Sequence, residues 1–390
     1  MNELNKPIYS LRQLILYFLK LGTTGFGGPV ALVGYMHKDL VEDRKWISEE
    51  EYKQGLALAQ LAPGPLAAQL GIYIGFVHHR VLGATLTGIA FVLPSFIMVV
   101  FLGIAYKLYG GLTWMQAVFY GVGASVIGII AMSSYKLTVK SIGKFNIQSF
   151  KTNGLLWLFF AVALITTFVT KQEQVLLFIG AGLLYMFVKA PPNWFNKFSV
   201  NGLILLQIGF LQYEPSTLGK IAIFFTKAGA FVFGSGLAIV PFLHAGVVTE
   251  NHWLTEQQFL DAVAVAMITP GPVVITVGFI GYLIAGFPGA CVASLATFLP
   301  CYVFTVIPAP YFNRIAKNTS IKAFVDGITA SVVGALVGAV VVIGTQNITD
   351  FPTATIAVLT VLALLYIKKI QEPYIILVSA VLGIILKSIL

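Results

Sequence analysis

The stretch LAQLAPGPLAAQL (58–70) is an apolar sequence interrupted by Pro-Gly-Pro at 63–65. Proline removes a backbone donor and clashes with the preceding turn, and glycine adds conformational freedom, so this triplet ends a helix. A second stretch, VAMITPGPVVITV (265–277), carries the same interruption at 270–272. Two identical breaks in apolar sequence indicate a requirement that both places share.

The composition is that of a membrane protein. Hydrophobic residues make up 58% of the 390 residues, charged residues 10%, and the mean hydropathy is +0.89. Soluble domains carry roughly 25% charged residues. Stretches such as 86–105, 155–168 and 333–344 read as membrane helices or large parts of them. The N-terminal MNELNKPIYS lacks the apolar core of a cleaved signal peptide, so we expect an all-α, multi-pass membrane protein that keeps its first segment.

The formal net charge of +9 reflects lysines and arginines that cluster in short loops, as the positive-inside bias predicts. We therefore expect the lipid bilayer and not a nucleic acid as partner, together with a field that attracts anions. Cys291 and Cys301 lie about 15 Å apart in one predicted helix and cannot pair. The sequence predicts no metal site, no cofactor motif and no catalytic triad.

The chain contains an internal repeat. At an offset of 207 residues (253 − 46), Trp46 matches Trp253 and the break at 63–65 matches that at 270–272; after residue 83 the register continues at 206. We expect two copies of one unit, residues 1–198 and 199–390, joined near 190–215.

Each copy is expected to contain the same elements. The first, 11–36 or 218–243, is apolar but broken by TGFGGP or FGSG; the second, 49–79 or 256–285, contains Pro-Gly-Pro; four plainer spans follow.

SEEE (48–51) and TEQQ (255–258) match the capping box, which starts a helix. A helix that starts near residue 49 and ends near Pro63 is about 21 Å long and crosses only part of a ~30 Å core.

Equivalent loops differ in charge. The loops after the first and fourth elements each hold four Lys or Arg in copy one and none in copy two, whereas the loop after the third holds none in copy one and three in copy two. By the positive-inside rule the copies have opposite orientation. Inverted repeats are typical of secondary transporters.

The same counts constrain the second element. The loops after the first and fourth elements of copy one both carry the basic residues typical of cytoplasmic loops, although three elements separate them. Both loops can lie on the same side of the membrane only if one of these elements does not cross it. This condition is met if 49–80 is a re-entrant hairpin that returns at HHR (78–80). Whether 11–36 spans or is also a hairpin stays open, because 199–213 could supply an extra crossing.

In lipid, broken helices are tolerated where protein or a water-filled cavity satisfies the freed backbone groups. Helix starts near the bilayer midplane, with Pro65 and Pro272 at the first position, would point N–H groups and partial positive charge at an oxyanion. The alternative is that the breaks serve packing. The candidate substrate-binding residues are Lys20, Thr23, Thr24, Gly25, Gly27, Gly28, Pro29, Gln60, Pro63, Gly64, Pro65, Lys227, Gly234, Ser235, Gly236, Thr269, Pro270, Gly271 and Pro272.

Lys20 and Lys227 are repeat-equivalent and would either balance a dianion or snorkel from near a helix end. Weaker candidates for gating or proton coupling, for which a solvated surface or helix capping is the alternative, are Arg44, Glu49, Glu256 and Asp326.

The duplicated motifs, FGGP (26–29) before a charged loop, W-I-S/T-E-like sequence and A-x-x-P-G-P-like sequence, resemble the chromate ion transporter family in its long, two-repeat form. The resemblance covers nearly the whole chain. Copy two departs from it at Gly236, where copy one has Pro29. The resemblance implies chromate efflux across the inner membrane, resistance to chromate, and an ion gradient as the driving force, as in an antiporter.

Other functions stay open. Chromate is a tetrahedral dianion shaped like sulfate, so uptake or exchange of sulfate or another small inorganic oxyanion is an alternative. An anion channel is an alternative of another class, and a membrane chromate reductase is disfavoured because no redox cofactor site is visible. A homodimer is an open alternative to a monomer.

Overall fold

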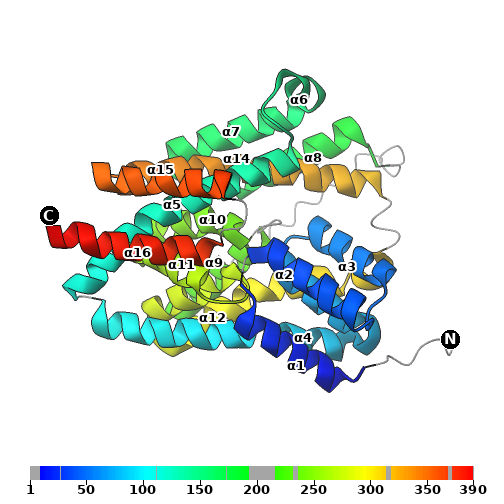
Figure 1. Cartoon of the computed structure of the whole chain (residues 1–390). Coiled ribbons are helices and arrows are strands. Elements are labelled where there is room, and N and C mark those ends of the chain that lie inside the picture. The colour runs from blue at the N-terminus through cyan, green and yellow to red at the C-terminus, as the bar shows by residue number, and fades with distance from the viewer. Residues whose placement is uncertain are drawn as a thin grey trace.

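The structure, a computed structural model, is built of helices, and the residues that it describes contain no strand. These residues are 9–26, 28–110, 112–172, 174–192, 216–231, 236–312, 318–367 and 371–389. Most helices lie side by side along one common direction (Figure 1).

The elements of the two halves match in position. The first half contains α1 (Leu11–Thr24), α2 (Gly28–Met36), the π-helix η1 (His37–Asp43), α3 (Glu49–Leu61), α4 (Leu66–Tyr109), α5 (Thr113–Ser141), α6 (Ile147–Thr152), α7 (Gly154–Thr170) and α8 (Val175–Lys189). The second contains α9 (Thr217–Ala230), η3 (Gly236–Ile239), α10 (Val240–His244), η4 (Ala245–Glu250), α11 (Glu256–Ile268), η5 (Val273–Ile275), α12 (Thr276–Val306), η6 (Ala309–Tyr311), α14 (Thr319–Asn347), α15 (Phe351–Tyr366) and α16 (Glu372–Ile389). α11 follows α3 by 207 residues at both ends (256 − 49, 268 − 61), and α14 follows α5 by 206 (319 − 113, 347 − 141).

Within the described residues, four helical segments are long and apolar enough to cross a membrane: Leu66–Tyr109, Thr113–Ser141, Val273–Tyr311 and Thr319–Asn347. α7, α8 and α15 are shorter apolar helices. Large apolar side chains such as Phe101 and Leu295 point outward, 67% and 73% exposed, as expected of a surface in contact with lipid. The protein is an all-α polytopic membrane protein, as its composition predicts.

α4 folds back on itself at Arg80, whose φ is +53°. The reversal brings two glycine backbones into contact, so that a Cβ on Gly83 would overlap the carbonyl oxygen of Gly75. α4 therefore has a short arm (66–79) and a long arm (81–109) that run antiparallel.

α12 repeats this arrangement. Its φ/ψ angles leave the helical region at Ala285 and Gly286, and a Cβ on Gly289 would overlap the carbonyl oxygen of Gly281. The short arm of α12 is 276–284 and its long arm is 287–306.

The first element is a hairpin and not a span. Tyr9, just before α1, stacks on Trp46, just after η1, with 4.9 Å between ring centroids. The chain therefore enters and leaves at the same end, and its reversal lies at the TGFGGP break, where Gly28 has a φ of +73°. The alternative crossing at 199–213 lies outside the described residues.

The two halves interdigitate. α14 packs on α7 and α8, whereas its counterpart α5 packs on α15 and α16, and α4 packs on α12 (Figure 1). Each half therefore buries its apolar helices largely against the other half.

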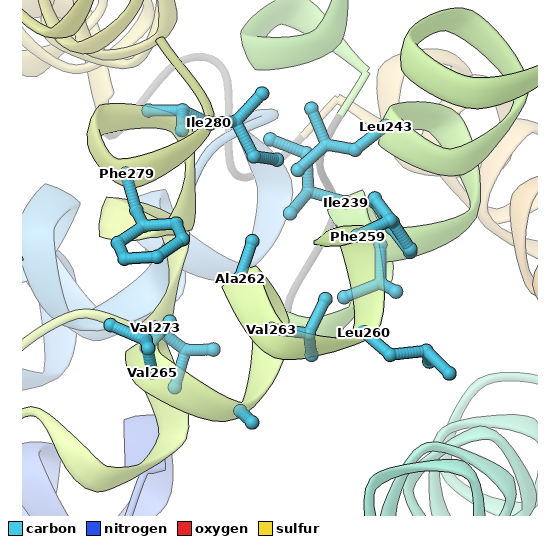
Figure 2. Close-up of a cluster of buried hydrophobic side chains, with 14 of the residues drawn as sticks. Ile239, Leu243, Phe259, Leu260, Ala262, Val263, Val265, Val273, Phe279 and Ile280 are labelled. Atoms are coloured by element: carbon cyan, nitrogen blue, oxygen red, sulfur yellow. The ribbon is translucent and has the colours of Figure 1, made fainter. Parts of the chain in front are cut away.

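The main core surrounds α11, which is apolar on all sides apart from its first turn and Asp261. A helix of this kind belongs in an interior. Figure 2 shows its neighbours from η3, α10, η5 and the short arm of α12: Ile239, Leu243, Val273, Phe279 and Ile280 around Phe259, Leu260, Ala262, Val263 and Val265.

Candidate functional site

The first Pro-Gly-Pro lies at the tip of a helical hairpin made by α3 and the short arm of α4. Glu51 and His78 lie 3.3 Å apart at the open end, and the Tyr73 hydroxyl donates to Gln54 Oε1 at 3.4 Å nearer the middle. We call residues 62–65 the first tip turn. The hairpin geometry follows from its local signals, because a capping box starts α3 at Glu49 and the prolines end it at Leu61.

The second hairpin, α11 with η5 and the short arm of α12, has its second tip turn at residues 269–272. Its capping box is also formed, between Thr255 and Gln258. Both capping boxes and the helix end near Pro63 are therefore confirmed. One detail differs: Pro65 and Pro272 occupy the N-cap and not the first helical position, because helical φ/ψ angles begin one residue later.

The two hairpins open toward opposite ends of the long arm of α4. The open end of the first hairpin lies at the start of that arm, next to Arg80. The open end of the second lies at its finish, where Lys107 Nζ sits 5.1 Å from the Tyr282 ring centroid. A cavity of about 400 Å³ there is lined by Tyr106, Lys107, Gly110, Trp253, Leu254, Gln258 and Leu283.

The tip turns reach the middle of the molecule. The backbone N–H of Gly271 donates to the carbonyl oxygen of Gly25 at 2.9 Å, which joins the second tip turn to the break of the first element. Gly271 (φ +98°) also lies against Ser95, near the middle of the long arm of α4. Gly64 (φ +145°) lies against Cys301 on the long arm of α12, with 3.1 Å from an ideal Cβ to Sγ.

Ser95 and Gln69 carry polar atoms without partners at these contacts. Both side chains are 0% exposed. The Ser95 hydroxyl has no hydrogen-bond partner, and Gln69 donates to the Pro63 carbonyl at 2.9 Å while its Oε1 has none. Buried polar groups are normally paired, so unpaired ones call for an explanation such as a ligand or an ordered water.

The predicted binding residues divide into two groups. Those at the breaks are buried or half-buried around the tip contacts: Gly25, Gly28, Pro29, Pro63, Gly64, Pro65, Gly236, Thr269, Pro270, Gly271 and Pro272.

The second group is exposed: Lys20, Thr23, Thr24, Gln60 and Lys227. The Thr23 and Thr24 hydroxyls donate to carbonyl oxygens within α1, at 2.7 and 2.9 Å. The structure thus brings the break residues together but leaves both lysines on exposed helix faces. Gly27, Gly234 and Ser235 lie outside the described residues.

Two of the gating candidates occupy equivalent places. Glu49 accepts from His37 at 2.8 Å and Glu256 from His244 at 2.7 Å, and in each case the histidine belongs to the segment that leads back from the first element. The hydrogen bonds from His37 and then Lys53 hold the pKa of Glu49 below its usual value.

Arg44 is exposed and its guanidinium lies over the rings of Tyr17 (5.3 Å) and Trp46 (4.7 Å). Asp326 is half-buried in α14. Among the described residues, no group of three His, Cys, Asp or Glu is arranged to hold a metal ion.

Sequence reasoning missed four residues: Ser95, Gln69, Cys301 and the buried Asp261. One signal was present, because Ser95 and Cys301 are equivalent at the offset of 206 (301 − 95). Their roles depend on contacts between halves, which an offset alone does not reveal.

The sequence model of the chromate transporter family matches residues 12–186 and 219–384. This chain belongs to the chromate transporter family. It is a transport protein and not an enzyme, as the resemblance of its motifs implies.

Two relatives in this family are similar over nearly their full length. The chain is 60% identical to a chromate transport protein of Cupriavidus metallidurans over 384 residues, which cover 97% of this chain and 94% of that protein. It is 59% identical to a probable chromate transport protein of Synechococcus elongatus over 389 residues (98% and 97%). An uncharacterized transporter of Methanocaldococcus jannaschii is 29% identical over 400 residues (98% and 96%). No solved structure matches.

Proposed function

We propose that this protein is a secondary active transporter that exports chromate across the inner (plasma) membrane. The family match and the two chromate transport proteins support chromate as the substrate. The observation that carries the mechanism is that the tip turns of two oppositely opening hairpins both end in the interior, where Gly271 bonds to Gly25 and Gly64 contacts Cys301. A central site reached by hairpins from both faces suits alternating access.

The proposed anion site lies between the tip turns. The helix starts after residues 65 and 272 supply free N–H groups and partial positive charge, and the Ser95 hydroxyl supplies a donor without a competing partner. Hydrogen bonds from such donors to a charged oxyanion are stronger than neutral ones. Because Gly64 and Gly271 have no side chains, an anion can approach the backbone of the tip turns closely at these two positions.

The proposed architecture is a pair of inverted repeats, 1–198 and 199–390. It is supported by hairpins that open toward opposite ends of α4 and by the matching helix bounds. The face with the open end of the first hairpin carries Lys38, Lys45 and Lys53, which favours this face as cytoplasmic. A single crossing between α8 and α9 would produce the inversion, and the apolar sequence at 199–213 is the candidate for the central part of such a crossing.

Exchange of sulfate for another oxyanion is the second candidate, because backbone N–H and hydroxyl donors separate two tetrahedral dianions poorly. The buried contacts that the tip turns make with Gly25, Ser95 and Cys301 favour a carrier over a continuous pore.

The test is flux through the purified full chain in liposomes. Chromate and sulfate uptake would be measured against concentration under imposed pH and sulfate gradients. We expect saturable chromate flux that responds to the gradients and shows counterflow. Saturable sulfate flux without chromate flux would favour the second candidate; flux that never saturates would indicate a channel; no flux of either anion would contradict the proposal.

A further inference from the structure

Asp261 is a buried carboxyl group in the second hairpin. It lies in the second turn of α11 and is 2% exposed. Its Oδ2 accepts from the Tyr106 hydroxyl at 2.6 Å, and its Oδ1 accepts from Gln257 Nε2 at 2.8 Å. Both donors are neutral, and no cationic side chain of the described residues forms a salt bridge with it.

A buried carboxylate without a cation is costly, and protonation removes the cost. Two neutral hydrogen bonds hold the group in place in either state, because a protonated Asp261 can itself donate to the Tyr106 oxygen. The geometry thus fits a group that gains and loses a proton without leaving its position.

The Tyr106–Asp261 hydrogen bond joins the two halves. Tyr106 belongs to the long arm of α4, and its ring is held edge-on by Phe119 of α5 (5.4 Å) and Phe279 of α12 (5.6 Å). A movement of α11 relative to α4 must break or remake this bond. The protonation state of Asp261 therefore bears on the relative position of the hairpin and the long arm.

Both hydrogen-bond partners of Asp261 lie next to water-accessible space. Tyr106 lines the cavity of about 400 Å³ at the open end of the hairpin. Gln257, the second partner of Asp261, is exposed.

Other titratable groups on neighbouring elements do not share this position. The elements packed against α11 carry Tyr73, His78, His79, Arg80, Tyr106, Lys107 and Tyr109 (α4), Tyr120, Tyr135, Lys136 and Lys140 (α5), Glu250 (η4), Tyr282, Cys291, Cys301 and Tyr302 (α12), and Glu372, Tyr374 and Lys387 (α16). α11 itself also carries Glu256, which is bonded to His244. Of these, Tyr106 contacts Asp261.

We propose that Asp261 is the proton-binding site that couples substrate movement to the proton gradient, with Tyr106 as its positioning residue. In each cycle the carboxylate takes up one proton from water at the open end of the second hairpin and releases it after the tip turns rearrange. This inference rests on the proposed transport function and names its coupling group. The equivalent position in the first half is Gln54 (261 − 207), so the first hairpin has no such carboxyl.

The experiment compares three proteins in liposomes that contain a pH-sensitive dye: the unchanged chain, Asp261→Asn and Asp350→Asn. Asp350 is a matched control, because it also accepts from a tyrosine hydroxyl, Tyr120 at 2.5 Å, but at an exposed site. Chromate flux, proton movement and chromate–chromate exchange would be recorded from about pH 5.5 to 8.5.

We expect Asp261→Asn to lose chromate-linked proton movement by at least about tenfold and to lose the pH dependence of flux, while exchange continues. Asp350→Asn should keep all three. Continued proton movement in Asp261→Asn would overturn the inference, as would chromate flux without proton movement in the unchanged chain. Absence of chromate flux in the unchanged chain would instead contradict the proposed function.

Tyr106→Phe provides a second measurement in case Asp261→Asn does not fold. It keeps the ring packing and removes one hydrogen bond, so we expect normal assembly, retained exchange and a shifted pH midpoint of flux. An unchanged midpoint would count against the inference.

Discussion

A methyl group on residue 271 would occupy the space of the Ser95 hydroxyl, and its backbone φ of +98° is one that side chains rarely adopt. We expect Gly271→Ala to destabilise the protein by about 1–3 kcal/mol and to reduce chromate flux strongly. Thermal unfolding in detergent and liposome flux measure the two effects.

The matched control is Gly180→Ala in α8, where an added Cβ meets no atom within 4 Å. It should leave flux unchanged. Equal loss of flux in both variants would mean that the second tip turn has no special role.

Ser95 presents a second test at this scale. Ser95→Ala removes a buried hydroxyl that has no protein partner, so stability should change little while the apparent affinity for chromate falls about tenfold, as expected for one hydrogen bond to a charged ligand. Ser331→Ala in α14 removes a hydroxyl that is also buried and unpaired, and it should leave the affinity unchanged. Titration of flux against chromate concentration distinguishes the two outcomes.

Glu49 and Glu256 form hydrogen bonds with histidines near the open ends of the two hairpins, and the stabilisation from the Glu49 bonds is sensitive to acid. Its pKa is lowered by the hydrogen bonds from His37 and Lys53, so the stabilisation is complete above the ordinary carboxyl value and is lost as the pH falls through the lowered value. We expect the melting temperature to fall between about pH 5 and pH 3, and Glu49→Gln to remove part of that fall. An identical pH profile in the variant would show that this bond contributes nothing.

Local sequence signals predicted where the helices begin and end, but they did not predict the contacts between helices. The capping boxes at Ser48 and Thr255 and the prolines of the tip turns fixed where the half-helices begin and end, because such effects act within four residues. The reversal at Arg80 was predicted only as an exit from the hairpin. Its close helix contact depends on Gly75 meeting Gly83, which hydropathy does not report.

The candidate site was predicted in part for the same reason. The breaks themselves are at the tip contacts, but Ser95 lies within a continuous apolar stretch of sequence and resembles any serine in a membrane span. Lys20 and Lys227 stood out in the sequence because they are charged, yet their side chains are exposed.

At the scale of the whole molecule, interdigitation makes the halves depend on each other. α7 and α8 bury their apolar faces against α14, and α15 and α16 bury theirs against α5. We expect residues 1–198 and 199–390, each expressed alone, to aggregate or be degraded, and their co-expression to restore chromate flux. Size-exclusion chromatography in detergent checks this, and a stable, monodisperse single half would contradict it.

Orientation is testable by labelling single cysteines in a background without Cys291 and Cys301. Ser48→Cys and Arg80→Cys, at the open end of the first hairpin, should react from one side of the membrane. Asn251→Cys and Phe287→Cys, at the open end of the second, should react from the other side. Reaction of all four from one side would refute the inverted arrangement.

Asp261 has Gln54 at its equivalent position in the other half, and this difference between the halves has a consequence for the energetics of transport. Under the proposed mechanism, a single carboxyl of this kind would carry one proton inward per cycle as the dianion leaves. Both movements would transfer positive charge toward the interior, so transport would be electrogenic. Each elementary charge that crosses gains roughly 2.3 kcal/mol per 100 mV of potential. An interior-negative voltage would therefore drive export even where the pH on the two sides is equal.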